Sequence, residues 1–394
     1  MIEVLNEKLK QDLIDLSKYI YDHPELGHEE FLSSEAHCVL LEKYGFKVER
    51  GYMGLKTGFR AEFVNEQSAT QDCQLPTVAY LAEYDALPKV GHGCGHNILG
   101  TVSTGAAIHL SQTMGAVPGR IVVFGTPAEE TDGAKVKYAA EGAFDDIDAA
   151  LIAHPFYRYE KSGHSLAIRA LRFTFKGKAA HAVSAPEQGI NALDACILMF
   201  NGIGLLRQQL LPSAYIHGII REGGTAANTI PDLVVADFYV RAETLTYLNE
   251  VREKVEACAK AGAAAAGAKV EITEFEAGND NLITNETIME CLAKNWRKVG
   301  ITEIIDALPA CGSSDVGNVS HVCPTIHPYY SIMVPGEEYP THTEEFREAT
   351  LRQPAMEALE KNVCAMAMTG RDIMESPQLL TDIKEEFRKA KEKA

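Results

Sequence analysis

The sequence predicts an α/β fold, with a mostly parallel sheet, helices on both faces and an inserted α+β domain. Short apolar runs at residues 78–81, 120–125 and 149–153 have the composition of buried strands. Stretches with helical spacing of apolar residues separate these runs, and this alternation is typical of a parallel sheet. Near residue 166 the pattern changes to strands with one exposed face, which indicates a second folding unit.

Helical spacing appears first at the N-terminus, where intervals of three and four residues separate Ile2, Leu5, Leu9, Leu13, Leu16 and Ile20. This spacing predicts an amphipathic helix over residues 2–20 that stops near Pro24, because proline cannot continue a helix. We expect further helices over residues 29–44 and 97–114.

The inserted region has the strand and helix order of a ferredoxin-like unit. The predicted elements are strands at 167–176, 215–221, 233–242 and 270–275, and helices at 191–209 and 248–266. We therefore expect a larger domain formed by residues 1–165 and 279–394, with the inserted domain at residues 166–278. The charged end, 382–394, has the composition of a solvated helix or a frayed terminus.

The composition limits the classes of protein to which this chain could belong. Its 394 residues suggest two domains, at ~100–200 residues per domain. A net charge of -18 argues against a nucleic-acid-binding protein, which needs a basic surface. We find neither a secretory signal nor an apolar run near the ~18 residues of a membrane span. The nine cysteines form no CxxC pair, so we expect reduced thiols and a cytoplasmic location.

Polar clusters follow the predicted strands of the larger domain, where ligands collect in open α/β sheets. Glu83 and Asp85 come directly after the first of these strands, and Cys94 and His96 lie in the glycine-rich segment 91–97. A thiolate and an imidazole two residues apart can ligate a metal from a tight turn. Alone, the first cluster is also typical of a polar loop and the second of a glycine turn. A cysteine nucleophile, with His96 as its base, is a further alternative.

Two more strand ends carry similar side chains. Glu129 and Glu130 follow the strand at 120–125, and His154 follows the strand at 149–153. Adjacent carboxylates repel each other unless a cation neutralises them, and one can bind metal while its neighbour accepts a proton from water. Alone, the two acids could start a helix and the histidine could be a packed structural residue. Three such strand ends together favour a metal centre, with His342 as the candidate fifth ligand.

These clusters, together with motifs elsewhere in the chain, resemble those of the aminoacylase/hippuricase superfamily of dinuclear-metal peptidases and amidohydrolases. The motifs cover nearly the whole chain and are His23-Pro24-Glu25-Leu26, Asp85-Ala86-Leu87-Pro88, Cys94-Gly95-His96, Glu129-Glu130, Gly177-Lys178-Ala179-Ala180-His181, Asn228-Thr229-Ile230-Pro231 and Thr341-His342. Residues 82–88 and 312–342 are most similar to the branch of aminobenzoyl-glutamate hydrolases and of dipeptidases that act on β-alanyl or basic dipeptides. The resemblance implies a metallopeptidase catalytic domain with an inserted lid and dimerisation domain.

The resemblance implies two divalent cations, with zinc expected and manganese or cobalt as alternatives. The residues that match the family's metal ligands are Cys94, His96, Glu130, His154 and His342, with Cys94 as the bridge. Glu129 matches the general base. Asp85 matches a carboxylate that orients a ligand imidazole.

The inserted domain is implied to complete the active site. His181 of the partner subunit is expected to stabilise the oxyanion, which makes the protein a homodimer. Asn228 and Arg241 match lid residues that contact the substrate carboxylate, and Gly312 and Ser313 match a loop near the same carboxylate. Neither His92 nor His327 matches a family role, and we expect both to be structural or pocket-lining.

The predicted function is metal-dependent hydrolysis of amide bonds next to an amino-acid carboxylate, by a dipeptidase or an aminobenzoyl-glutamate-type amidohydrolase. Asn97 stands where hippuricases have Asp, and Leu81-Ala82-Glu83 stands where they have Arg-Ala-Asp, which argues against a hippuricase. One alternative is an N-acyl-amino-acid deacylase, which would use the same metals and base. Another is a non-catalytic metal-binding or ligand-sensing protein, against which the presence of Glu129 argues.

Overall fold

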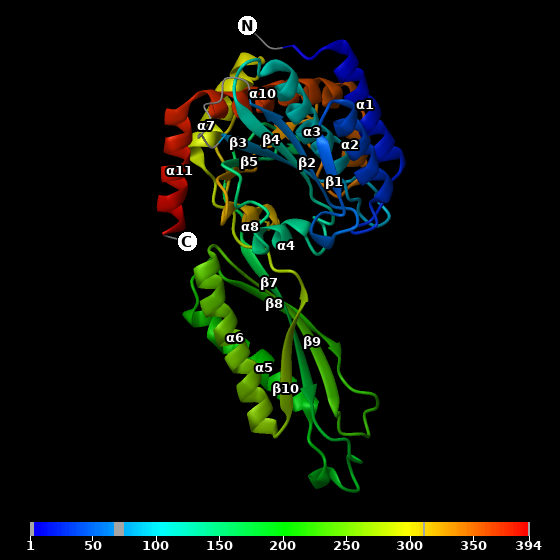
Figure 1. The fold of residues 1–394 in the computed structure, drawn as a ribbon. Helices are drawn as coiled ribbons and strands as arrows, with labels where there is room; N and C mark the ends of the chain where they lie inside the picture. The colour runs from blue at the N-terminus through cyan, green and yellow to red at the C-terminus, as the bar shows by residue number, and fades with distance from the viewer. Residues whose placement is uncertain (1–3, 67–74, 310–311, 393–394) are drawn as a thin grey trace. The chain divides into compact units, whose positions relative to one another are not determined.

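The computed structural model describes residues 4–66, 75–309 and 312–392 (Figure 1). The chain forms two compact units. The larger unit holds the described residues up to His164, Leu282–Pro309 and the described residues from Ser314 onward. The inserted unit holds Ser165–Asn281 and a short segment that ends at Ser313. These limits lie within three residues of the 166–278 insertion that we expected, apart from the short segment.

The larger unit is built on a six-stranded sheet whose strand order is β1-β2-β4-β3-β5-β11. Four neighbouring strands run parallel: β4 (Gly119–Gly125), β3 (Thr77–Ala82), β5 (Ala149–Leu151) and β11 (Thr325–Ile326). Two strands toward one edge, β1 (Lys47–Arg50) and β2 (Phe59–Asn65), pair in the antiparallel direction. The sheet is thus mostly parallel, as predicted, and β1 and β2 are additions that the apolar pattern did not reveal.

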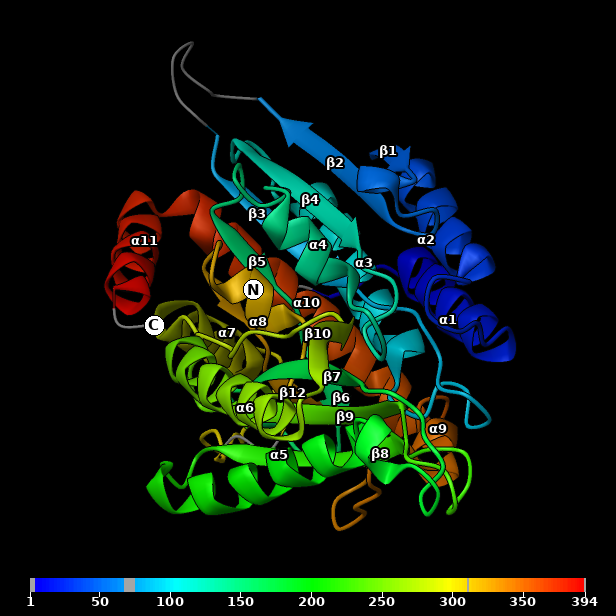
Figure 2. The same ribbon diagram turned by 90° about the horizontal axis from the view of Figure 1, so that it is seen from below.

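Helices cover both faces of this sheet, as Figure 2 shows from below. One apolar core joins alternate residues of β3, such as Val78 and Tyr80, to α1 (Glu7–Asp22), α3 (His96–Thr113), α7 (Glu286–Lys298) and α10 (Gln353–Glu375). A second core joins Ala79 and Leu81 to α4 (Ala134–Ala140) and α8 (Val316–Ser320). Because both faces are buried, the parallel strands are apolar throughout.

The remaining elements of the larger unit are α2 (Phe31–Lys43), β6 (His154–Phe156), which pairs in parallel with β12 (Tyr329–Ser331), α9 (Glu344–Ala349) and α11 (Pro377–Lys391). The first helix begins at Glu7, because the Asn6 side chain accepts a hydrogen bond from the Leu9 N–H at 2.8 Å and caps the helix. Residues 2 and 3 of the predicted helix lie outside the described residues. No helix in the described ranges is long and apolar enough to cross a membrane.

The inserted unit has a four-stranded antiparallel sheet of order β10-β7-β9-β8, which is the ferredoxin-like order. Its elements are β7 (Ala167–Lys176), α5 (Ala192–Leu206), β8 (Tyr215–Glu222), β9 (Leu233–Ala242), α6 (Leu245–Ala266) and β10 (Lys269–Glu276). Leu171, Phe173 and Phe175 alternate into a core with both helices. The strand at 167–176 therefore has the limits that the alternating pattern predicted.

Candidate metal centre

The candidate site lies where the parallel strands of the larger unit end. Asp85 follows β3, Glu129 follows β4, His154 follows β5 and His327 follows β11. Because parallel strands point the same way, the segments that follow them lie at one edge of the sheet. The strand ends that the sequence singled out are therefore neighbours in space, and β11 adds a fourth.

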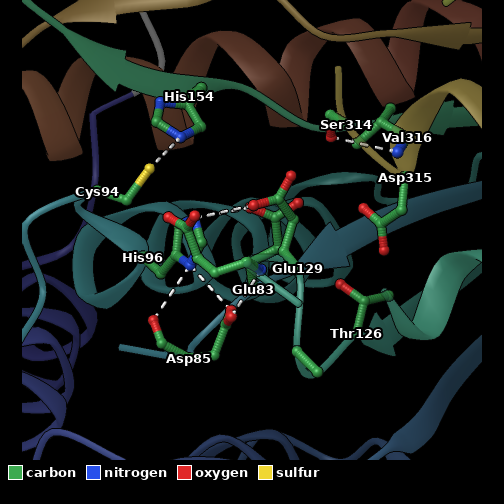
Figure 3. Close-up of polar contacts among 12 residues, drawn as sticks. Glu83, Asp85, Cys94, His96, Thr126, Glu129, His154, Ser314, Asp315 and Val316 are labelled. Atoms are coloured by element: carbon green, nitrogen blue, oxygen red, sulfur yellow. Dashed lines mark hydrogen bonds and ion pairs between the residues drawn. The ribbon is translucent and has the colours of Figure 1, made fainter. Parts of the chain in front are cut away.

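Cys94 and His96 are held on either side of a glycine at the start of α3. Gly95 has φ +83°, and a Cβ there would lie 2.6 Å from Cγ of Pro155, so only glycine fits without a shift. The Cys94 sulfur lies 3.4 Å from Nε2 of His154, and Figure 3 shows the two side chains pointing toward each other. The turn therefore directs both possible ligands of this segment into the site.

Asp85 fixes two neighbouring groups of the site. Its Oδ1 lies 2.9 Å from Nδ1 of His96, which leaves Nε2 of that ring to face the centre. Its Oδ2 accepts a hydrogen bond from the Glu130 N–H at 3.0 Å. A carboxylate that fixes the ring nitrogen away from a metal is a common partner of a ligand histidine.

Two groups of possible ligands share the Cys94 sulfur. The ligand atoms of Cys94, His96 and His154 lie within 4.8 Å of one another, and so do those of Cys94, Glu130 and His342. In the second group, Nε2 of His342 lies 3.4 Å from Oε1 of Glu130. The five residues proposed as ligands are thus brought together, and the arrangement allows one thiolate to bridge two cations.

The chemistry of these groups fits divalent metal ions. Nε2 of His96 and Oε1 of Glu130 are buried and accept or donate no hydrogen bond of good geometry among the described residues, although Glu83 Oε2 lies 3.3 Å from the former and His342 Nε2 lies 3.4 Å from the latter. Leaving such atoms unpaired is costly unless a ligand completes them. Burial raises the pKa of the Cys94 thiol well above its usual range, so a cation is needed to hold it as a thiolate. Thiolate, imidazole and carboxylate together are a typical zinc donor set.

Glu129 stands beside these groups without belonging to either of them. It forms a further cluster with Glu83 and His96, and its Oε2 lies 3.9 Å from Nε2 of His96 (Figure 3). Burial, followed by the negative charges of Glu83 and Asp315, raises the pKa of Glu129 well above its usual value. A carboxylate with a raised pKa, next to the position of a cation, has the properties of a general base.

A buried ion-pair network underlies this part of the site, and we did not predict it. Nζ of Lys135, on α4, lies 2.8 Å from Oε1 of Glu83 and 2.6 Å from Oδ1 of Asp315, and all three side chains are buried. Lys135 therefore balances two of the negative charges next to Glu129. These partners come from three distant segments, so no local spacing in the sequence could have revealed them.

Two non-glycine residues of the site have left-handed backbone conformations. Ala128 has φ +63° and His342 has φ +67°. Such residues are strained, and strain of this kind is concentrated at functional sites. The His342 N–H donates to the Gly93 carbonyl at 2.8 Å, which ties this half-exposed residue to the turn that carries Cys94.

Two further histidines differ in their surroundings. His92 is buried with Nε2 3.0 Å from the Ile20 carbonyl, which is a structural contact. His327 packs edge-on against His154, with 5.7 Å between the ring centroids, and its Nε2 has no hydrogen-bond partner in the part of the chain that the structure describes. Burial lowers the pKa of His327 to about 3, so this ring is neutral.

The inserted unit brings its candidate residues together in two places. His181 is exposed, and the backbone N–H of the next residue donates to the Asn228 carbonyl at 3.0 Å. Arg241, on β9, donates to Oγ of Ser313 at 3.2 Å, and the Gly312 carbonyl accepts a hydrogen bond from the backbone N–H of residue 166. The roles of these residues toward a substrate stay predictions.

The fold and the two candidate ligand groups are compatible with a dinuclear metallohydrolase. Peptidase family M20/M25/M40 matches residues 79–361, and this chain belongs to that family. The predicted resemblance and the prediction of a hydrolase are confirmed by this match.

Named relatives agree with the family match. The Xaa-Arg dipeptidase of Mus musculus is 36% identical over 386 residues, which is 95% of this chain and 88% of that protein. A p-aminobenzoyl-glutamate hydrolase chain of Escherichia coli (strain K12) is 31% identical over 315 residues, which is 75% of this chain and 64% of that protein. The Bacillus subtilis YXEP protein, a dinuclear metal-binding peptidase of family M20, has the same fold, with a TM-score of 0.69, 21% identity, and coverage of 94% of this chain and 99% of that one.

Proposed function

We propose that this protein is a dinuclear metallodipeptidase that cleaves the amide bond before a C-terminal amino acid with a free carboxylate. The observation that carries the proposal is the Cys94 sulfur, which two ligand groups share beside the carboxylate of Glu129. The similarity to an Xaa-Arg dipeptidase supports a basic C-terminal residue in the substrate. The net charge of -18 is compatible with this preference, since it favours the approach of a cationic peptide.

The proposed mechanism assigns one task to each group of the site. Cys94, His96 and His154 would hold one cation, and Cys94, Glu130 and His342 the other. Bound there, the pair would lower the pKa of a water molecule and polarise the scissile carbonyl. Glu129 would accept the proton of that water and later deliver it to the leaving amine.

Asp85 is proposed to keep the His96 ring in the tautomer and orientation that ligation needs. The 2.9 Å contact between Oδ1 and Nδ1 supports this role, because it makes Nε2 the nitrogen that is free to bind a metal. The same carboxylate accepts the Glu130 N–H, so it couples the positions of two proposed ligands.

The inserted unit is proposed to recognise the substrate. Arg241 offers a fork of donors suited to a carboxylate, and its hydrogen bond to Ser313 holds the guanidinium beside the loop that includes Gly312. His181 of the partner subunit is proposed to donate to the oxyanion, and Asn228 is proposed to contact the substrate carboxylate together with Arg241. Removing one oxyanion donor typically raises the barrier by ~2.7–4 kcal/mol.

We propose a homodimer that forms through the inserted unit. Strand β8 is an edge strand that pairs on one side only among the described residues, and Tyr215, Ile219 and Ile220 on it are exposed. Ile197 and Leu198 of α5 are exposed as well. An edge strand and apolar residues of this kind are suited to pairing with a second copy of the chain.

We propose zinc as the metal and the cytoplasm as the location. A thiolate and imidazoles favour zinc, although manganese or cobalt could occupy the same donors. The cysteines in the described part of the chain are all free, which is compatible with a reducing compartment.

The proposal is tested by removing metal with a chelator, reloading with zinc, manganese or cobalt, and assaying hydrolysis. The panel contains dipeptides ending in Arg or Lys, β-alanyl dipeptides, aminobenzoyl-glutamate and N-acyl amino acids. We expect the highest kcat/KM for a dipeptide ending in a basic residue, and no activity without metal. Preference for N-acyl amino acids would instead favour the deacylase. Two bound metals per chain with no turnover of any substrate would favour a binding protein.

A further inference from the structure

The residue before the two catalytic-site acids has an unfavourable backbone conformation. Ala128 has φ +63°, and it directly precedes Glu129 and Glu130. A non-glycine residue in this region is strained, so it persists only when its surroundings hold it. The contacts of Ala128 should therefore identify what holds it.

The Ala128 N–H donates to a buried carboxylate. Oε1 of Glu30 accepts this hydrogen bond at 2.8 Å, and Oε2 of Glu30 accepts one from Oγ1 of Thr57 at 2.8 Å. Glu30 is 0% exposed. The carboxylate is thus anchored on one side by the hydroxyl of Thr57 and reaches the strained residue on the other.

The same segment of chain also packs against the Ala128 side chain. A Cβ at Gly27 would lie 2.9 Å from Cβ of Ala128 and 2.7 Å from Oγ1 of Thr131. The Ala128 carbonyl accepts hydrogen bonds from the N–H groups of Thr131 and Gly133, at 3.1 and 2.8 Å. Both polar backbone groups of Ala128 are therefore engaged, and the residue is enclosed.

The conformation of Ala128 matters because the two acids that follow it have different neighbours. Glu129 joins Glu83 and His96, whereas Glu130 joins Cys94 and His342. Two adjacent acids serve separate positions only if the backbone before them is fixed. An error of about 1 Å in the position of a reacting group can lower a rate about 100-fold.

We propose that Glu30 is a positioning residue for the reaction, because its buried carboxylate holds Ala128 in the left-handed conformation that directs Glu129 and Glu130 to their separate places. The expected effect of Glu30 on kcat rests on the proposed function. We call the hydrogen bond from the Ala128 N–H to Glu30 the clamp. It is a property of the fold, so its strength can be measured without an activity assay.

Two variants of Glu30 separate the length of its side chain from its charge, and a variant of Ala128 tests the backbone strain. Glu30→Gln removes the charge but keeps a side-chain oxygen within reach of the Ala128 N–H. Glu30→Asp keeps the charge, but its side chain is shorter by one methylene and its oxygen lies farther from that N–H. Ala128→Gly removes the strain that the clamp opposes, since glycine adopts a positive φ readily. Glu25→Asp is the matched control, because Glu25 accepts from Leu32 and Ser33 at the start of α2 and has no contact with Ala128 in the described hydrogen bonds.

We expect Glu30→Asp to lower kcat about 10- to 100-fold with KM little changed, and to weaken zinc binding about tenfold. Glu30→Gln should stay within about fivefold of the parent in kcat, as expected from its retained acceptor. Introducing Ala128→Gly into the Glu30→Asp chain should recover part of the loss. Glu25→Asp should lower thermal stability and leave kcat unchanged.

Hydrogen exchange followed by mass spectrometry gives a readout apart from activity. Peptides that cover residues 126–133 should exchange faster in Glu30→Asp than in the parent, and those of Glu30→Gln should not. A larger loss in Glu30→Gln than in Glu30→Asp would overturn the proposal in favour of a charge effect. Equal losses in the two variants, or an undiminished loss in the Ala128→Gly background, would overturn it in favour of a general packing role for residue 30. If Glu30→Asp does not fold, Gly27→Ala, which presses on Ala128 directly, replaces it with the same expected results. If the parent protein hydrolyses none of the substrates, the proposed function is refuted. Hydrogen exchange and zinc titration would still show whether Glu30 holds Ala128 in place.

Discussion

The Cys94 sulfur and the His154 imidazole lie 3.4 Å apart, in line with two donors that share one cation. The same sulfur is a member of the group that includes Glu130 and His342. One side chain therefore takes part in both proposed metal positions, and its removal should have a larger effect than removal of any other ligand.

Cys94→Ala should lose both metal ions, because each position loses a donor. His342→Ala should keep close to one metal per chain, because only the second group contains His342. Elemental analysis of purified, dialysed protein gives the metal content. Cys258→Ala, at a partly exposed cysteine of the inserted unit, is the control and should keep the parent content. A Cys94→Ala chain with two tightly held ions would remove this cysteine from the ligand set.

Glu129→Gln should keep both metals and lose activity. The amide has nearly the shape of the carboxylate but cannot accept the proton of the attacking water, and loss of a general base typically lowers kcat by about 10²–10⁴-fold. Steady-state kinetics and metal content should be measured on the same preparation. Glu130→Gln serves as the comparison, since it should lose metal as well as activity. A Glu129→Gln enzyme with parent kcat would disprove the assignment of the base.

Lys135→Met should destabilise the larger unit by about 3–5 kcal/mol, because it leaves the carboxylates of Glu83 and Asp315 buried without a cation. Urea denaturation of the metal-free protein measures the change. Adding Asp315→Asn should recover part of the loss. Lys137→Met, on the same helix but paired with the partly exposed Glu141, should change stability by less than about 0.5 kcal/mol. Equal effects at positions 135 and 137 would contradict the network.

The stability of the fold should fall in acid partly because of His37. Burial lowers its pKa from 6.5 to about 3, so the unfolded chain binds a proton below pH 6.5 that the folded chain excludes. The free energy of unfolding therefore decreases as the pH falls from about 6.5 toward 3, by up to about 1.4 kcal/mol per pH unit for this residue. Urea titrations of the metal-free parent and of His37→Gln should differ in slope by that amount. Identical slopes would mean that His37 is protonated in the fold.

Mixing inactive Glu129→Gln and His181→Ala subunits should restore activity if each site uses His181 of the partner subunit. In a mixed dimer one site then has both functional residues, so random assortment gives roughly a quarter of the parent activity. Subunit exchange must be verified with differently tagged chains. Exchange without recovery would place both residues in the same subunit or exclude His181 from catalysis.

The fold could be predicted well where one period dominates the sequence. The strand at 167–176 alternates without interruption, so its limits match β7. The apolar runs before Asp85, Glu129 and His154 predicted parallel strands, and parallel strands bring the segments that follow them to one edge. Strand β1 was missed because it is a short, mostly exposed edge strand. In β2 the apolar residues Phe59, Ala61 and Phe63 alternate with polar ones, but the run is short and only partly buried, and it was not singled out.

The candidate site was predicted mainly from residues that follow strands, and His342, which does not, was added as the fifth ligand of the predicted metal centre. Lys135 and Glu30 escaped attention because each acts on residues that are distant in the sequence, as the contact between Glu30 and Ala128 illustrates. A buried lysine or glutamate shows no periodicity that separates it from a surface residue. Burial and pairing depend on tertiary packing, which a single sequence does not state.

The order of the ligands along the chain has a consequence for biosynthesis. The second group remains incomplete until His342 has been made, and the whole inserted unit is translated between Glu130 and that residue. If the proposed ligands are correct, a nascent chain on the ribosome lacks one donor of the second group until His342 has been added. Loading of the second ion would then be possible only late in synthesis, and chains truncated before His342 would lack one of the proposed ligands.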